Sequence, residues 1–252
     1  MNKYICLIIT LLVSVSCSNA QKVDFYRFKI LETYPHDITS YTQGLFFHNG
    51  ELYESCGQYG ESSMRKVDIK SGKAVQRVNF DGRYFLEGSC MINGKLFILT
   101  WREGVCFVCD PVTFKETARI PLRGEGWGLT TDGKQLIMSD GSSNIYFKDP
   151  RTFADTRTIS VTKDGKPVTY LNELEYIDGK IWANVYGQDV IVMIDPKTGV
   201  VEGILDCRNI LPRRDYTSRT DVLNGIAYNP DTKELYITGK YWPKMFKIKI
   251  EK

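Results

Sequence analysis

The feature of this chain that most constrains its fold is a segment that recurs five times, once in roughly every 40 to 50 residues. Each copy is a short apolar run, a turn, and a second run in which apolar and polar residues alternate. Four of the turns contain Asn-Gly or Asp-Gly, which β-hairpins prefer because both turn residues need positive φ. The fifth copy has a longer turn at 229–231. The copies are residues 43–55, 87–101, 127–140, 172–184 and 224–238.

A second hairpin follows the first in most copies. Its turn carries Asp-Pro at Asp110, Asp149 and Asp195, and in the first copy the segment 68–72 takes that place. The repeating unit is therefore two hairpins, or four antiparallel strands, which is typical of one blade of a β-propeller. Five units predict an all-β, five-bladed β-propeller. The alternative, a β-sandwich, would not require so regular a repeat.

The last unit is one strand short. It stops after three strands, at residues 244–250, whereas the segment 23–35 has the alternation of a half-exposed strand. We expect this N-terminal strand to become the outer strand of the last blade and so to close the ring without an open edge. Residues 22–252 then form a single propeller domain, which we expect to be a monomer.

Residues 1–17 differ from the rest of the chain. Lys3 is followed by an apolar segment from Ile5 to Val15, which is too short to span a bilayer as a helix and is typical of a secretory signal peptide. Cleavage before Cys17 would give a lipid-anchored periplasmic or outer-membrane protein, and cleavage after Ala20 would give a soluble exported one. The sequence favours the lipid anchor. The net charge is only +3 and the basic residues are scattered, so nucleic acid is not an expected partner.

The cysteines beyond the signal segment are too sparse for a disulfide scaffold. They are Cys56, Cys90, Cys106, Cys109 and Cys207. Cys106 and Cys109 have the spacing of a redox or zinc motif. They lie in an apolar run, however, where residues three apart point to opposite faces of a strand. We therefore expect both to be structural.

The repeat also predicts a ring of polar and aromatic side chains. In a propeller the first strand of each blade lines the central channel. Alignment of the copies on their turns gives one position just before each first strand, and these five positions should form a ring at one mouth of the channel. None of them is aliphatic, as a ring needed only for packing would be. The ring positions are Gln43, Glu87, Trp127, Asn172 and Asn224.

The second strand of each blade returns to the same mouth, where it should add Trp101, Tyr186 and Lys240. Apolar walls with a few convergent polar groups are typical of a small-molecule site. A ring that merely hydrogen-bonds the blades together is the alternative. Metal and nucleophile chemistry have little support, because the chain has only two histidines, His36 and His48, and no triad-like pattern. The chemistry must therefore depend on a carboxylate, amides and a lysine.

Four motifs in order resemble those of the plant and bacterial type of glutaminyl-peptide cyclotransferase. They are YPHDITSYTQGL (34–45), EGWGLTTDG (125–133), LNELEYIDGKIWANVY (171–186) and TGKYWPKMF (238–246). The resemblance covers nearly the whole chain past residue 33. It implies a five-bladed propeller without a catalytic metal, in some members with a bound calcium ion. It also implies an enzyme that converts the N-terminal glutamine of peptides or proteins to pyroglutamate and releases ammonia.

The resemblance assigns roles to particular residues. Glu87 matches the catalytic acid of the family, and Lys240 matches its Thr-Gly-Lys motif. Gln43, Trp127 and Asn172 match three further family motifs, so four of the five ring positions reached from the repeat recur here. One departure is visible, because plant members usually carry Trp where Tyr186 stands.

This chemistry suits the predicted pocket. The substrate α-amine, with a pKa near 8, must lose a proton before it attacks its own side-chain amide, and Glu87 can accept that proton and later supply one to ammonia. Lys240 or an amide can stabilise the oxyanion, and Trp101, Trp127 and Tyr186 can hold the glutamine folded.

Two alternatives remain: a metal-dependent, lactonase-like propeller hydrolase, and a non-catalytic ligand-binding propeller.

Overall fold

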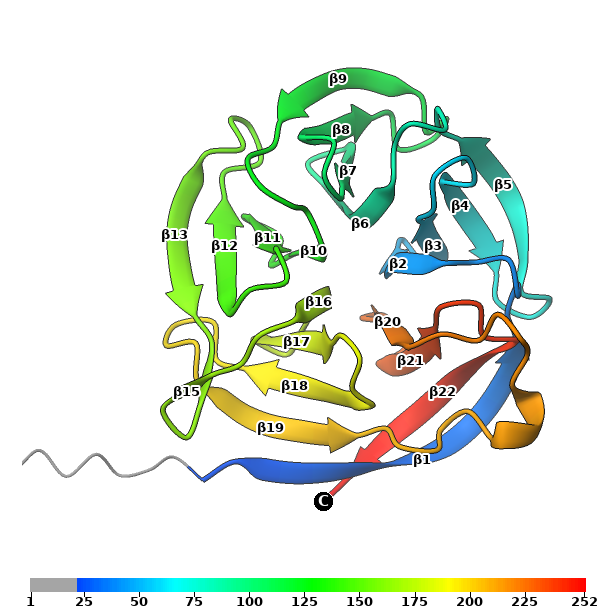
Figure 1. Cartoon of the computed structure of the whole chain (residues 1–252), viewed down its shortest axis with the longest axis vertical. Helices are drawn as coiled ribbons and strands as arrows, with labels where there is room; N and C mark the ends of the chain where they lie inside the picture. Colours follow the sequence, from blue (N-terminus) through cyan, green and yellow to red (C-terminus); the bar gives the residue numbers. More distant parts are fainter. Residues whose placement is uncertain (1–21) are drawn as a thin grey trace, which may run out of the picture.

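In the computed structural model, residues 22–252 form a ring of five four-stranded antiparallel blades about a central axis (Figure 1). Blade 1 is β2 (Thr42–His48), β3 (Glu51–Cys56), β4 (Ser63–Asp68) and β5 (Lys73–Asn79). Blade 2 is β6 (Leu86–Ile92), β7 (Lys95–Thr100), β8 (Val105–Cys109) and β9 (Glu116–Pro121). Blade 3 is β10 (Leu129–Thr131), β11 (Leu136–Ser139), β12 (Asn144–Lys148) and β13 (Asp155–Ser160).

Blade 4 is β16 (Leu171–Ile177), β17 (Lys180–Val185), β18 (Val190–Ile194) and β19 (Val201–Asp206). Blade 5 is β20 (Leu223–Asn229), β21 (Glu234–Gly239), β22 (Lys244–Glu251) and β1 (Asp24–Pro35). A small hairpin of β14 (Thr162–Lys163) and β15 (Lys166–Pro167) links blades 3 and 4, and a short 3-10 helix, η1 (Arg213–Asp215), precedes blade 5. The predicted five-bladed propeller is confirmed. The predicted signal peptide, Cys17 and both cleavage sites lie outside the described residues.

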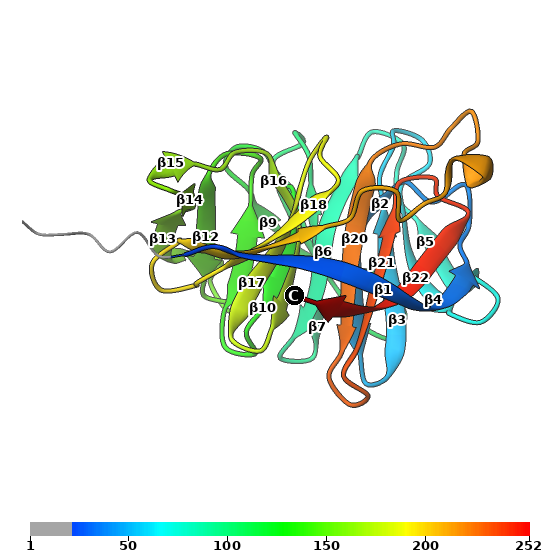
Figure 2. The ribbon, with the colours of Figure 1, turned by 90° about the horizontal axis from the view of Figure 1, so that it is seen from below.

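The N-terminal strand closes the ring as predicted. β1 pairs antiparallel with β22 from Arg27 to Pro35 and so completes blade 5. Its first residues, Asp24 to Tyr26, also pair in parallel with β19, the outer strand of blade 4. Figure 2 shows β1 crossing the side of the molecule between these two blades. One strand therefore seals two blade edges, and blades 4 and 5 become a single eight-stranded sheet.

The hairpin turns follow the expected chemistry in part. Asn49-Gly50, Asn93-Gly94 and Asp178-Gly179 all have positive φ at both residues, as a two-residue hairpin turn requires. In blade 3 only Gly133 of the Asp-Gly pair has positive φ, and in blade 5 Lys233 takes that conformation. The two-residue turn thus holds for blades 1, 2 and 4, while the other two blades use longer connections.

Apolar side chains fill the wedges between neighbouring blades. Cys109 packs between blades 1 and 2, in a cluster with Phe46, whereas Cys106 packs between blades 2 and 3 with Leu129. The two cysteines therefore face opposite sides of β8, as the strand periodicity predicted. All the cysteines of residues 22–252 are buried and free. No helix in this part of the chain is long and apolar enough to cross a membrane.

Candidate active site

Four of the five ring residues lie at a β-bulge or similar irregularity near the start of the inner strand. The strand register shifts between Thr42 and Gly44, Leu86 and Ser89, Leu171 and Leu174, and Leu223 and Ile226. The ring residues Gln43, Glu87, Asn172 and Asn224 lie within these shifts, inside the strands and not before them as the sequence suggested. A bulge leaves a residue unpaired and re-aims its side chain. Trp127 precedes the short β10 instead.

The glycine after most ring residues lets the inner strands of neighbouring blades meet backbone to backbone. The amide of Gly88 donates to the carbonyl of Trp127 at 2.7 Å, and a Cβ on Gly88 would lie 2.4 Å from the Leu129 nitrogen. A Cβ on Gly128 would lie 2.0 Å from the Asn172 carbonyl oxygen. Larger residues at either position would push the blades apart and widen the ring. The Gly steps of the repeat are therefore steric requirements of the channel mouth.

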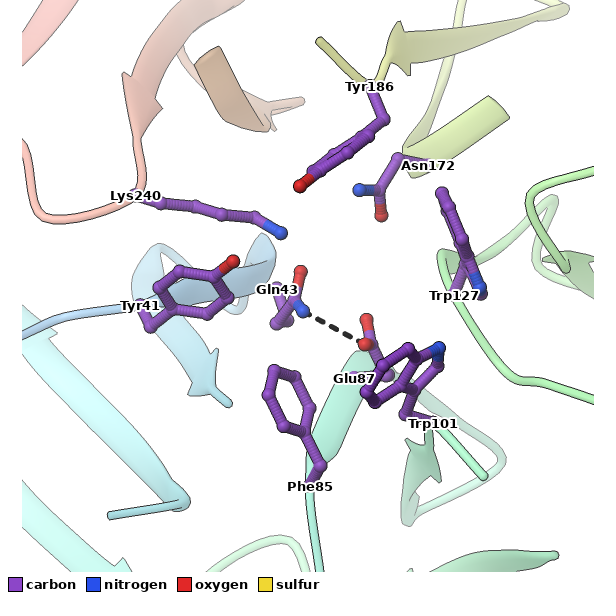
Figure 3. Close-up of a pocket in the computed structure, with 9 residues that line it drawn as sticks. All are labelled: Tyr41, Gln43, Phe85, Glu87, Trp101, Trp127, Asn172, Tyr186 and Lys240. Atoms are coloured by element: carbon purple, nitrogen blue, oxygen red, sulfur yellow. Dashed lines mark hydrogen bonds between the residues drawn. The ribbon is translucent and has the colours of Figure 1, made fainter. Parts of the chain in front are cut away.

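Ring residues and the residues near them enclose a cavity of about 200 Å³ at the mouth of the propeller (Figure 3). It is smaller than the roughly 300–1,000 Å³ typical of sites for drug-sized ligands, so it suits one amino-acid residue. Seven of the eight predicted site residues line it, and Asn224 does not. The lining residues are Tyr41, Gln43, Phe85, Glu87, Trp101, Trp127, Asn172, Tyr186 and Lys240.

Aromatic rings form most of the cavity wall. Phe85 lies edge-on to Tyr41 at 5.9 Å between ring centroids and 5.5 Å from Trp101. On the other side, Trp127 and Tyr186 meet in a T-shaped contact at 5.8 Å. Each such pair adds about 0.5–1.5 kcal/mol beyond the area that it buries, so these contacts contribute to the order of the wall.

Glu87 is the carboxylate of the cavity. It is 4% exposed, and its Oε1 accepts a hydrogen bond from Gln43 Nε2 at 2.9 Å. The Ser55 hydroxyl donates to the Glu87 carbonyl at 2.7 Å and so fixes its backbone. Burial raises the pKa of Glu87 well above its usual value; the Lys240 ammonium opposes this shift, and Glu103 and Glu125 reinforce it. A buried carboxyl group with a raised pKa in a cavity is a candidate for proton transfer.

Lys240 enters the cavity from the end of β21 and is 2% exposed. Its Nζ lies 4.5 Å from the ring centroid of Tyr41 and 5.2 Å from that of Tyr186. Burial lowers the pKa of Lys240 to about 8, against the attraction of Glu87 and Asp221. Within the described residues, Lys240 and Glu87 form no ion pair within 4.0 Å and attract each other only at longer range. Both side chains line the same cavity (Figure 3).

Asn172 and Asn224 differ in their relation to the cavity. Asn172 lines it, is 2% exposed, and has no hydrogen-bond partner for its Oδ1. A buried acceptor without a partner costs about 1–3 kcal/mol, which a donor on a ligand would recover. Asn224 lies behind the lining, where its Nδ2 donates to the Thr42 carbonyl at 2.9 Å and to Gln43 Oε1 at 3.4 Å. It therefore supports Gln43 from behind the cavity lining, where its own Oδ1 has no hydrogen-bond partner.

Glu125 holds two tryptophans of the wall with one oxygen. Its Oε2 accepts from the Nε1 of Trp101 at 2.8 Å and from the Nε1 of Trp127 at 2.9 Å. The other oxygen accepts from Arg102 Nε at 2.8 Å, and the Arg102 guanidinium stacks over the Trp101 ring. We call Glu125, Trp101 and Trp127 the indole clamp. It spans blades 2 and 3 and fixes the spacing of the two rings.

Two further carboxyl groups lie along β16 but do not line the cavity. Glu173 takes the place that glycine has in other blades, and its carboxyl accepts from the amides of Ile226 at 2.8 Å and Leu45 at 3.3 Å. Glu175 accepts from the amide of Tyr228 at 3.0 Å. Burial raises the pKa of both groups, that of Glu175 to about 8. Both therefore brace the inner strands.

Sequence reasoning missed Tyr41, Phe85 and Glu125. Tyr41 and Phe85 each stand two residues before a ring residue, so extending the repeat alignment by two positions would have found them. Glu125 stands two residues before Trp127, within a motif noted above, but its acceptor role depends on Trp101 in another blade. No group of three or more His, Cys, Asp or Glu side chains placed to hold a metal ion occurs within residues 22–252.

Comparison with known proteins gives the family. A profile of the glutamine cyclotransferase family matches residues 4–250. The chain belongs to this family. It is 40% identical over 230 residues to the glutaminyl-peptide cyclotransferase of Arabidopsis thaliana, which covers 88% of this chain and 71% of the plant protein. The crystal structure of Myxococcus xanthus glutaminyl cyclase matches with a TM-score of 0.85 and 32% identity, covering 91% of this chain and 99% of that one.

These matches confirm three expectations from the sequence: the plant and bacterial family, the propeller fold, and glutaminyl-peptide cyclotransferase activity. They leave the lactonase-like hydrolase and the non-catalytic propeller without support. Because the profile spans almost the whole chain, the cavity belongs to the family domain itself and not to an added module.

Proposed function

We propose that this glutamine cyclotransferase binds one N-terminal glutamine in the cavity and cyclises it with Glu87 as the acid–base group and Lys240 as the electrostatic group. The observation that carries the proposal is the placement of Glu87 and Lys240 on opposite sides of a small aromatic cavity, with no ion pair between them. A glutamine between the two would meet a proton acceptor at one end and a cation at the other.

In this proposal Glu87 moves protons in a balanced cycle. The ionised carboxylate takes one proton from the substrate ammonium, and the neutral amine nitrogen then bonds to the side-chain amide carbon. Glu87 passes its proton to the departing amide nitrogen as the carbon–nitrogen bond breaks, and it takes one from the new ring nitrogen. Ammonia finally leaves with that proton as ammonium, and Glu87 is ionised again. The raised pKa of Glu87 suits this exchange, because its carboxyl group holds a proton more readily than an exposed carboxyl group does.

Lys240 and Asn172 complement this cycle. Bond formation at the amide carbon places negative charge on its oxygen, and a Lys240 ammonium in a water-poor cavity stabilises that charge. With its pKa lowered to about 8, Lys240 keeps most of its charge at neutral pH. The unpaired Oδ1 of Asn172 is an acceptor for the amine or the amide N–H of the substrate. Gln43 holds the Glu87 carboxyl, and Trp101, Trp127 and Tyr186 keep the glutamine side chain folded back on its amine.

The substrates that we propose are peptides and proteins with N-terminal glutamine, whose later residues stay outside the cavity because its volume of about 200 Å³ suits one residue. The chain provides the acid, the base and the cation, so we propose that catalysis requires no metal; a structural calcium ion remains compatible with the family resemblance. From the sequence of residues 1–20 we further propose export, with a lipid anchor at Cys17 favoured over cleavage after Ala20. We also propose that the protein acts as a monomer.

One assay tests the reaction. Purified protein is mixed with a Gln-initiated peptide, and ammonia and the loss of 17 mass units (about the mass of one ammonia) are followed with and without a chelator. We expect equal amounts of ammonia and pyroglutamyl peptide, at a rate that the chelator leaves unchanged. Loss of turnover with the chelator, restored by added calcium or zinc, would contradict the metal-free mechanism.

A further inference from the structure

The YPHD motif at 34–37 is not explained by the cavity, since none of its residues lines it. Its histidine, His36, has a side chain only 1% exposed and lies where blades 1 and 5 meet. Both ring nitrogens face acceptors: Nδ1 lies 2.7 Å from the Trp242 carbonyl oxygen, and Nε2 lies 2.9 Å from Glu54 Oε1. An imidazole can donate from both nitrogens only when it carries two protons. The geometry therefore calls for a buried imidazolium.

The surrounding charges balance this imidazolium. Glu54 on β3 is 1% exposed and ionised, because His36 and then Arg65 outweigh burial and lower its pKa to about 2. Arg65 on β4 donates to Asp37 at 3.1 Å and to the Ser40 hydroxyl. The partners from blade 5 are neutral, namely the Trp242 carbonyl and the Thr238 hydroxyl. Two cations and two carboxylates thus form a closed cluster, which we call the seam cluster.

The seam cluster touches two segments that carry cavity residues. Glu54 also accepts from the hydroxyls of Ser40 at 3.0 Å and Thr42 at 2.7 Å, which flank Tyr41 and precede Gln43. His36 holds the carbonyl of Trp242, which ends the tight turn that begins at Gly239 and contains Lys240. The two segments are joined further by a hydrogen bond from the Tyr241 amide to the Ser40 carbonyl at 2.7 Å.

We infer that His36 and Glu54 are positioning residues that hold the Lys240 turn against the Tyr41–Gln43 segment and so set the distance across the cavity. The inference rests on the proposed roles of Lys240 and Gln43. Breaking the His36–Glu54 bond leaves the two segments joined by the Tyr241–Ser40 backbone hydrogen bond, but it removes the side-chain contact that holds the Trp242 end of the Lys240 turn. Misplacement of a reacting group by about 1 Å costs up to roughly 100-fold in rate.

The cluster also has a defined pH dependence. The attraction of Glu54 and the Trp242 carbonyl outweighs burial and raises the pKa of His36 in the folded protein. A histidine with a raised folded pKa stabilises the fold fully below its unfolded pKa, about 6.5, and loses this contribution as pH rises through the folded value. The contribution of His36 is therefore complete below about pH 6.5 and is lost as the pH rises through its raised folded pKa, provided that Glu54 stays ionised.

The test compares His36→Gln and Glu54→Gln with Lys148→Met. Lys148 is also a buried cation, paired with Asp155 at 2.5 Å in blade 3, and it does not line the cavity. At a temperature where circular dichroism shows every variant folded, kcat and KM are measured with a Gln-initiated peptide. We expect all three variants to have lower Tm. Only the two cluster variants should lose kcat, by about 10- to 100-fold, with KM changed by less than about threefold.

A second readout does not depend on turnover. The side-chain NMR titration of Lys240 should move from a pKa of about 8 toward the ordinary value of about 10.4 in His36→Gln, because a released turn exposes the amine. Lys148→Met should leave that titration unchanged. If His36→Gln does not fold, Thr42→Val removes a single hydroxyl from Glu54 and should reduce kcat severalfold.

The outcomes separate this inference from the proposed reaction. A wild-type protein that releases no ammonia contradicts the proposed reaction. The positioning role of His36 is then still tested by the Lys240 titration in His36→Gln. A His36→Gln protein with kcat within about twofold of wild type and an unchanged Lys240 titration overturns the inference. The seam cluster would then contribute only to the stability of the fold.

Discussion

Removal of Glu125 should weaken substrate binding without touching the reacting atoms. One oxygen of this carboxylate holds the indole nitrogens of Trp101 and Trp127, at 2.8 and 2.9 Å. In Glu125→Ala both rings become free to change rotamer, so substrate binding must order them again. Ordering costs about 0.5–1.5 kcal/mol for each side chain. For two rings the sum is about 1–3 kcal/mol, which corresponds to about a 5- to 150-fold increase in KM.

Glu103→Ala is the matched control for this prediction. Glu103 lies on the neighbouring loop and, like Glu125, raises the pKa of Glu87, but its carboxylate accepts from the Tyr59 hydroxyl and the Phe85 amide and from neither indole. The assay is steady-state ammonia release from a Gln-initiated peptide, combined with acrylamide quenching of tryptophan fluorescence. We expect Glu125→Ala to raise KM and increase quenching, with kcat reduced far less.

Two results would contradict the proposed role of the indole clamp in substrate binding. If Glu125→Ala and Glu103→Ala raise KM to the same extent, the effect arises from lost negative charge near Glu87. If Glu125→Ala leaves KM within about twofold of wild type, the rings are held by packing alone, and the two indole hydrogen bonds contribute little to binding.

Three further predictions follow from the charged groups and the ring closure. Lys240→Met should lower kcat by about 10²–10³-fold with little change in KM, as expected for loss of one oxyanion donor; a mainly KM effect in steady-state assays would contradict that role. Because burial lowers the Lys240 pKa to about 8, Lys240 loses its charge above that pH, and kcat should fall there. In Lys240→Arg the pH at which kcat falls should be higher. If that pH does not change in a pH–rate profile, the fall arises from another group. Deletion of residues 21–31 should expose the edges of β19 and β22 and cause aggregation by light scattering; a soluble, active, monomeric deletion variant would contradict closure by β1.

The fold was predictable from the sequence because its signals are local. Turn pairs such as Asn49-Gly50 and the alternation of the strands depend on neighbouring residues only, and five copies reinforce one another. Closure by β1 was also predictable, since the last unit lacked a strand. Its additional pairing with β19 was not, because that contact joins Asp24–Tyr26 to a strand of a different blade.

The residues of the site that occupy equivalent positions in the repeat were predictable from the sequence. Aligning the copies placed Glu87, Gln43 and Asn172 around one cavity, and the strand ends added Lys240. Asn224 occupies the equivalent position but lies behind the lining, where its amide binds the Thr42 carbonyl. The difference arises from packing at the seam between blades 1 and 5, which the alignment does not encode.

The supporting residues escaped prediction because their partners are distant in sequence. Glu125 acts on Trp101 across a blade boundary, and His36 acts on Glu54 and on the carbonyl of Trp242 across the seam. A histidine and a glutamate without a local pattern give no signal until the ring is closed. Such contacts depend on the whole topology, and they are where the structure adds most to the sequence.

The most direct test of the account is the turnover of Glu87→Gln beside Glu173→Gln. Both carboxyl groups are buried with raised pKa, but only Glu87 lines the cavity. Both variants should remain folded by circular dichroism, but Glu173→Gln should lower Tm, because one of its two acceptor oxygens is replaced by an NH2 group that cannot accept from a backbone amide. Loss of a positioned acid–base group predicts a fall in kcat of about 10²–10⁴-fold for Glu87→Gln, with Glu173→Gln close to wild type. A Glu87→Gln protein that keeps more than about a tenth of wild-type kcat would contradict the proposed mechanism.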